Sequence, residues 1–238
     1  LGTVAAEALQ RETGQQAQAE GAGRTALDVV VHRRFNPEGI TQYNIVPGLL
    51  GVILQMTMTM MTAMALTRET ERGTMENLLS MPVTAGEIML GKILPYFMVG
   101  AVQVVVVLGA ARLLFDVPFE GRFTLLAGGI ILFVMALVLL GYLFSTLART
   151  QMQAMQLTFF YFLPSILLSG FMFPFRGMPV WAQRLGEILP LTHFLRLIRA
   201  VMLKGADLAT VSRQLTALAL FVAIFAVLAL LRFRRTLD

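Results

Sequence analysis

The chain contains no cysteine, which excludes disulfide bonds and thiolate metal sites. Its two histidines, His32 and His193, are far apart, and no spacing typical of a zinc site occurs, so we expect no metal cofactor. Charged residues are also scarce and make up 14% of the chain, whereas soluble domains contain about 25%. Together with 57% hydrophobic residues, this shortage of charge indicates a protein that lies in a lipid bilayer.

The net charge of +5 is a feature that binding to nucleic acid would also explain. Proteins that bind single strands combine basic with aromatic residues, and that interleaving is missing from this sequence. In a membrane protein, an excess of Lys and Arg fits contact with anionic lipid headgroups. We therefore expect membrane lipids, and no nucleic acid, among the partners.

Five apolar runs are long enough to cross a bilayer, which takes about 17 to 25 residues. They cover residues 45–66, 93–115, 123–144, 154–173 and 215–231. None has Asp, Glu or His in its interior, so the runs offer no general acid or base to an intramembrane enzyme. We expect an all-α polytopic membrane protein with five transmembrane helices, whose two ends lie on opposite sides of the membrane.

The start of the chain differs from the rest because it is polar. Residues 1–24 are rich in Ala and Gln, residues 27–34 suit a short strand, and a turn signal follows at Asn36 and Pro37. This part is too short to have a core of its own. We expect residues 1–44 to be the end of a small water-facing domain, and residues 45–238 to form the transmembrane domain.

Residues 67–92 are the densest charged segment between two apolar runs. A short amphipathic helix is expected over about 70–81, and Pro82 should end it because proline lacks the amide donor. Its apolar face would carry Met75, Leu78 and Leu79. Thr84 and Glu87 then match a capping box that begins the next helix.

The stretch GEIMLGK at 86–92 fits the first seven positions of a phosphate-binding loop. Ile93 follows where magnesium binding needs Ser or Thr, and no strand precedes the stretch. We therefore expect no ATP hydrolysis by this chain, and no catalytic residues in it.

Residues 192–203 have the periodicity of an amphipathic helix, suited to the membrane interface or to a half-inserted hairpin. One stripe carries His193, Arg196 and Arg199, and Trp181 stands where an interfacial anchor is expected. The basic stripe would either contact anionic lipid or substrate, and headgroup anchoring is the favoured interpretation.

The first apolar run has a polar face formed by Gln55, Thr59 and Thr62, next to Met56 and further methionines. Polar groups in a bilayer prefer a protein interior or a wet cavity, and methionine adapts to varied ligands. The face is a candidate translocation path for bulky apolar compounds. Helix packing with interhelical hydrogen bonds is an equally good interpretation.

Charge counting does not settle the orientation. The positive-inside rule favours Lys and Arg on the cytoplasmic side. If residues 67–92 and the C-terminus are cytoplasmic, that side holds only seven of the nineteen basic residues. These are Arg68, Arg72, Lys92, Arg149, Arg232, Arg234 and Arg235.

Four stretches, in the same order, resemble ABC-2 type transporter permeases of the multidrug-export branch. FNP at 35–37 and VPG at 46–48 come first. ERGTMENLL at 71–79 is similar to the family's E-R-G-T-x-E-x-L stretch, which lies on the cytoplasmic side between the second and third spanning helices. PLTHFLR through LKG at 190–205 resembles the family's last external loop. The resemblance covers nearly all of the chain after residue 35.

The resemblance implies a permease of six spanning helices, and we expect the first of them to be missing here together with much of the external domain. It implies a bacterial inner-membrane protein in which residues 1–44 are the C-terminal remnant of an external (periplasmic) domain and the C-terminus is cytoplasmic. Such permeases pair as identical or different chains and bind a separate ABC ATPase subunit, which holds ATP and magnesium. A periplasmic adaptor is a further candidate partner.

The resemblance also turns the charged segment into a candidate coupling helix that receives motion from the ATPase. The residues expected to make this contact are Glu71, Arg72, Thr74, Glu76, Leu78, Leu79 and Pro82. The alternative is a solvated loop whose charges keep it out of lipid.

The expected function is therefore export of hydrophobic or amphipathic, drug-like molecules by the membrane subunit of an ABC exporter. One alternative is an ABC-2 exporter of a lipid or a polysaccharide, and another is a membrane scaffold that transports nothing.

Overall fold

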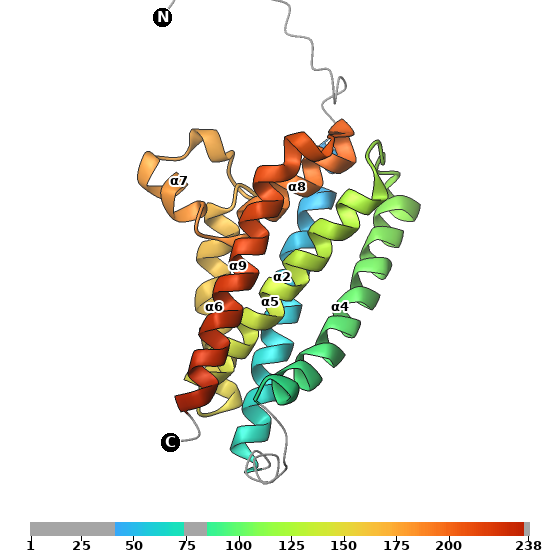
Figure 1. Ribbon diagram of the computed structural model, residues 1–238. Helices are drawn as coiled ribbons and strands as arrows, with labels where there is room; N and C mark the ends of the chain where they lie inside the picture. Colours follow the sequence, from blue (N-terminus) through green and yellow to red (C-terminus); the bar gives the residue numbers. More distant parts are fainter. Residues whose placement is uncertain (1–40, 74–84, 236–238) are drawn as a thin grey trace, which may run out of the picture. The chain divides into compact units, whose positions relative to one another are not determined.

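A computed structural model of the chain describes residues 41–73 and 85–235, and every regular element in these ranges is a helix (Figure 1). In chain order the elements are α2 (Thr41–Glu71), α4 (Ala85–Phe115), α5 (Phe123–Leu147), α6 (Gln151–Leu168), the 3-10 helix η1 (Phe175–Gly177), α7 (Val180–Gly186), α8 (Pro190–Lys204) and α9 (Leu208–Arg235). The all-α prediction is confirmed. The predicted strand at 27–34 lies outside the described residues.

Four helices in the described ranges are long and apolar enough to cross a membrane, and they match four of the five predicted runs. The spans are Ile45–Glu71, Ile93–Phe115, Phe123–Leu147 and Leu208–Arg232. The remaining run, 154–173, corresponds to α6, which ends at Leu168 because the chain turns at Gly170 with a φ of +85°. Three glutamines in its first two turns make α6 less apolar, so the count of five spans is not confirmed.

The helices form a bundle with two distinct ends (Figure 1). At one end, Arg68 of α2 donates a hydrogen bond to Gln151 at the start of α6, and we call it the Arg149 end after the residue in the α5–α6 connection. At the other, the His193 end, the N–H of Glu120 donates to the carbonyl of Met202 in α8 at 3.0 Å. Helices α2, α5 and α9 run toward the Arg149 end, and α4 and α6 run away from it.

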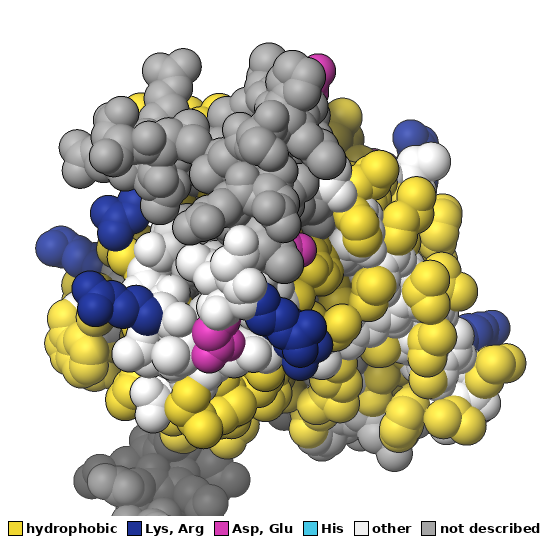
Figure 2. Space-filling view, turned by 90° about the horizontal axis from the view of Figure 1, so that it is seen from below, with side chains coloured by type: hydrophobic (Ala, Val, Ile, Leu, Met, Phe, Trp, Pro, Cys, Tyr) yellow, Lys and Arg dark blue, Asp and Glu magenta, His cyan; other side chains and the backbone are white. Residues whose placement is uncertain are grey.

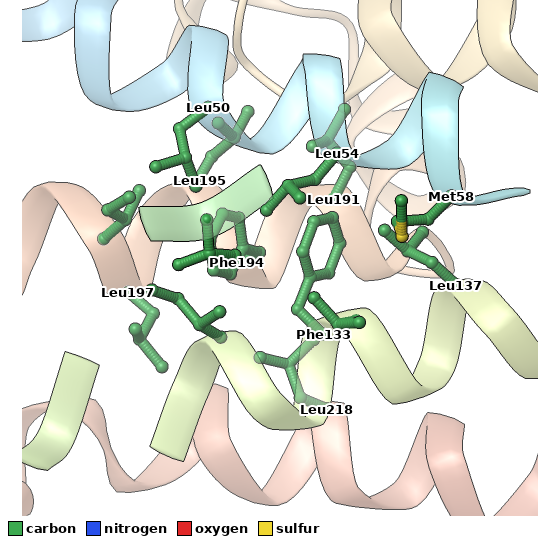
Figure 3. Close-up of a cluster of buried hydrophobic side chains, with 14 of the residues drawn as sticks. Leu50, Leu54, Met58, Phe133, Leu137, Leu191, Phe194, Leu195, Leu197 and Leu218 are labelled. Atoms are coloured by element: carbon green, nitrogen blue, oxygen red, sulfur yellow. The ribbon is translucent and has the colours of Figure 1, made fainter. Parts of the chain in front are cut away.

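Helix α5 is central and packs against α2, α8 and α9. The rings of Phe133 in α5 and Phe194 in α8 stack with their centroids 4.1 Å apart and their planes 4° from parallel (Figure 3). Both side chains are fully buried. The predicted amphipathic helix exists as α8, but its apolar face packs into this protein core and not into lipid.

Small residues allow α5 to approach its neighbours closely. A methyl group added at Gly141 would lie 2.7 Å from the backbone oxygen of Thr59 in α2, which cannot move aside without moving that helix. In lipid, where no hydrophobic effect drives helices together, such close packing is a main source of helix association.

This contact generates a prediction with a control on the same helix. Gly141→Ala should lower the melting temperature of the purified protein in detergent, because overpacking costs about 1 to 3 kcal/mol. Gly128→Ala should be neutral or slightly stabilising, because nothing lies within 4 Å of the added methyl group. Equal shifts for the two variants would contradict the close α2–α5 contact.

Candidate functional site

The first two predicted coupling residues lie where α2 ends: Glu71 is its last residue and Arg72 follows it, both of them exposed. Helix α2 continues past the predicted end at Leu66 as far as Glu71. Gly73 then ends it in the left-handed conformation, with a φ of +69° and its N–H donating to the carbonyl of Thr70 at 3.2 Å. A separate helix that begins at about Thr70 is therefore wrong, because Thr70 belongs to α2.

Gln151, the first residue of α6, ties this turn to the α5–α6 connection. Its Nε2 donates to Oε2 of Glu71 at 2.8 Å, and its Oε1 accepts from Nε of Arg68 at 3.2 Å. We call Arg68, Glu71, Arg72, Arg149 and Gln151 together the Arg149 surface. Figure 2 shows that basic and acidic side chains gather at this end of the bundle, with hydrophobic side chains around them.

The contribution of Arg149 and Gln151 to this surface was not predicted from the sequence. The available signal was local: Thr150 and Gln153 have the spacing of a helix cap, and Oγ1 of Thr150 accepts from the N–H of Gln153 at 3.3 Å. Oε1 of Gln153 also accepts from the N–H of Arg149 at 2.8 Å. The cap fixes where α6 begins, but sequence alone did not reveal that this start meets the end of α2.

Five of the predicted coupling residues lie outside the described residues. They are Thr74, Glu76, Leu78, Leu79 and Pro82. Helix α4 begins at Ala85, with Glu87 in its first turn, which confirms the predicted helix start. The coupling role of the residues between α2 and α4 therefore stays a prediction.

The predicted path residues Gln55, Thr59 and Thr62 are at most 1% exposed and face the protein interior. Oγ of Ser165 in α6 donates to Oε1 of Gln55 at 3.1 Å. Among the described residues, Nε2 of Gln55 and the hydroxyls of both threonines have no hydrogen-bond partner. Met56 is half-buried. In a single chain this face is occupied by packing, and a role in translocation stays a prediction.

The predicted interfacial residues divide into two groups. Trp181 on α7 is 63% exposed, as an anchor at the membrane surface requires. His193 is buried instead, and its Nε2 donates to the backbone carbonyl of Glu187 at 3.0 Å. Arg199 donates to the carbonyl of Gly170 at 3.1 Å. Contact of these residues with lipid stays a prediction.

Arg196 forms an ion pair with Glu187, whose Oε1 lies 2.7 Å from Nη2. The guanidinium also lies over the ring of Phe175, 4.3 Å from its centroid. Partial burial disfavours the charged form of Glu187, but the hydrogen bond and charge of Arg196, with the charges of His193 and Arg213, lower its pKa below 4.5. The pair fixes the start of α8 at the His193 end.

Metal binding has no support in the described ranges, where no three His, Asp or Glu side chains come close enough to hold an ion.

The Arg149 surface offers a partner protein exposed charges and hydrogen-bonding groups. They lie on the ends of α2 and α6, which the side chain of Gln151 connects.

The ion pair predicts a pH-dependent stability. A carboxyl group with a lowered folded pKa stabilises the fold above its unfolded pKa, and this contribution is lost as the pH falls through the folded value. Glu187→Gln should therefore lower the melting temperature in detergent at about pH 7, and the difference from the native protein should shrink below about pH 4. The control is Glu120→Gln at the same end, and a difference that is independent of pH would contradict the assignment.

Comparison with known proteins identifies a family of membrane transporters. The model of the family described as "ABC-2 family transporter protein" matches residues 2–231. The probable multidrug ABC transporter permease YbhR of Escherichia coli is 34% identical over 208 residues, which cover 87% of this chain and 56% of the relative. YbhS of the same bacterium, with the same description, is 34% identical over 195 residues, covering 80% and 52%.

The inner membrane transport permease YhhJ of Escherichia coli is 36% identical over 216 residues, covering 86% of this chain and 55% of the relative. The chain thus spans about half the length of the relatives that it matches. From the family match, the identities and the four apolar spans, we conclude that this multi-pass membrane protein belongs to the ABC-2 family of transporter permeases.

Proposed function

We propose that the chain forms the membrane-spanning part of a bacterial inner-membrane ABC exporter that moves hydrophobic or amphipathic small molecules outward. A separate subunit hydrolyses the ATP and holds the nucleotide and magnesium. The observation that carries the proposal is an ABC-2 bundle with an exposed charged surface where α2 ends, next to the connection into α4. Two relatives described as probable multidrug permeases support the class of cargo.

The ATPase subunit docks at the Arg149 end, on the Arg149 surface and the connection between α2 and α4. Exposed charges fix the register of such a contact and suppress wrong partners. Gln151 supports this role because its side chain bonds to both Arg68 and Glu71. A displacement of this surface by the ATPase would therefore move α2 and α6 together.

Helix α4 carries the motion. It follows the connection directly, and its buried residues Ile93, Gly100, Val104 and Ala111 form one narrow stripe. A methyl group at Gly100 would lie 2.7 Å from Cγ1 of Val134 and 3.0 Å from Sδ of Met58, so α4 packs closely against the core at this glycine. Hollows flank the helix on both sides, toward α5 and toward α2. Helix α4 therefore has room to tilt about Gly100 as a rigid body.

In this arrangement the Arg149 end and the C-terminus are cytoplasmic, and the His193 end is external. Two permease chains assemble with the ATPase subunits, and a periplasmic adaptor receives cargo on the external side.

Charge reversal at the docking surface tests the proposal. The double variant Glu71→Lys and Glu76→Lys should reduce co-purification with the ATPase and its permease-stimulated ATP hydrolysis by at least about tenfold, because like charges at an interface cost more than 1.4 kcal/mol. Glu71→Gln should retain binding better, because its amide oxygen still accepts from Gln151.

The matched control reverses an exposed acidic residue at the other end, Glu120→Lys, and should leave binding and stimulation unchanged. Intact binding and stimulation in the double variant would refute docking at this end.

A further inference from the structure

A groove between α2 and α4 contains a polar pair about midway along two of the apolar spans. Its lining residues are Thr57, Met61, Met98, Val99, Val102 and Gln103. Thr57 and Gln103 lie near the middle of the spans Ile45–Glu71 and Ile93–Phe115. A polar side chain at this depth is costly unless it has a partner, and such residues commonly mark functional sites.

The hydroxyl of Thr57 does not need Gln103 as a partner. Its Oγ1 lies 2.7 Å from the carbonyl oxygen of Ile53, one turn back in α2, and 2.9 Å from Oε1 of Gln103. A hydroxyl has one proton to donate, which these two acceptors share, and without Gln103 it would still bond to the carbonyl of Ile53. The contact with Gln103 is therefore dispensable for α2.

The amide of Gln103 is left with unused hydrogen-bonding capacity. Its Oε1 faces Thr57, and among the described residues its NH₂ group has no partner. The side chain is half-buried, so this group faces the groove. The remaining walls are methionine and valine side chains, of which Met61 and Met98 are 45% and 59% exposed.

We propose that this groove is a binding site for an apolar molecule that carries a hydrogen-bond acceptor, such as a ketone, ester or ether oxygen, which the NH₂ group of Gln103 recognises. The groove measures about 480 Å³, within the range of roughly 300 to 1,000 Å³ that small-molecule sites occupy. Flexible methionines adapt to the apolar part, and a single polar group fixes its orientation. The inference rests on the proposed export of amphipathic molecules and names where such a molecule binds.

The hollow on the other side of α4 differs in chemistry. Its walls, from Phe97 and Val104 to Ile130 and Val134, carry no polar side chain. It can take a lipid acyl chain but offers no group that selects a ligand, so the site is assigned to the α2–α4 groove alone.

An alkylated benzophenone tests the assignment, because it is apolar, carries one ketone oxygen, and on illumination inserts into nearby C–H bonds, readily into those of methionine. The full chain is purified in lipid nanodiscs without ATP or partner, illuminated with the probe, and the adducts are located by mass spectrometry. We expect adducts concentrated at Met61 and Met98. The exposed Met152 and Met172, on other elements, should be labelled weakly.

Three variants separate recognition from packing. Gln103→Leu should reduce labelling of Met61 and Met98 about fivefold, the effect of one lost hydrogen bond. Thr57→Val removes the same Thr57–Gln103 contact but keeps the amide, and should retain labelling. Gln156→Leu makes the same chemical change at an exposed position on α6 and should also retain it.

Three outcomes would overturn the proposal. Labelling that Gln103→Leu does not change would make the groove an unselective apolar slot. Labelling in proportion to exposure over all methionines would indicate simple partitioning, and no labelling of Met61 or Met98 would mean that something else covers the groove. Because no ATPase is present, failure here leaves the docking experiment unaffected, and failure of docking leaves this site unaffected.

Discussion

The enclosure of α5 by other helices is the constraint on which the structure depends. Lipid tails are as apolar as leucine side chains, so the hydrophobic effect does not drive α5 from lipid into the protein interior. Close packing of complementary surfaces has to stabilise this arrangement. The stacked rings of Phe133 and Phe194 fix α8 against α5, and Gly141 lets α2 approach to backbone contact. Two points of close fit at different heights thus hold α2, α5 and α8 as one rigid group, against which other elements can move.

Within this group, α2 presents a different chemistry in each direction. Its inward face buries Gln55, Thr59 and Thr62, its face toward α4 carries Thr57, and its last turn carries Arg68 and Glu71. A helix that is fixed to the core, open to a groove and exposed at one end can link a docking surface to a binding site. Helix α4 is the counterpart, because it touches the core closely at Gly100 and has hollows on both flanks.

Much of this architecture followed from hydrophobic patterning, which records what a segment must bury. The spans in α2, α4, α5 and α9 were predicted because a run of about twenty apolar residues indicates a transmembrane helix. Patterning did not distinguish burial in lipid from burial in protein, so α8 was expected at the membrane interface although Phe194 lies in the core. The first apolar run predicts an end at Leu66 because charged residues follow it, but charged residues can continue a helix. Helix α2 runs on to Glu71, and Gly73 in a left-handed conformation ends it. The bridge from Gln151 to Glu71 joins residues far apart in sequence, and no local pattern encodes it.

The central claim is that α4 moves against a rigid core when the partner ATPase binds ATP. Because the chain has no cysteine, pairs of spin labels can be placed without background. Val106→Cys on α4 with Ile131→Cys on α5 spans the mobile contact, and Ile131→Cys with Leu220→Cys on α9 spans the rigid one, all at exposed positions. The account predicts that trapping the ATPase with ATP and vanadate produces a second population of distances for the α4–α5 pair and none for the α5–α9 pair. Identical distance distributions for the α4–α5 pair with and without trapped nucleotide would contradict it.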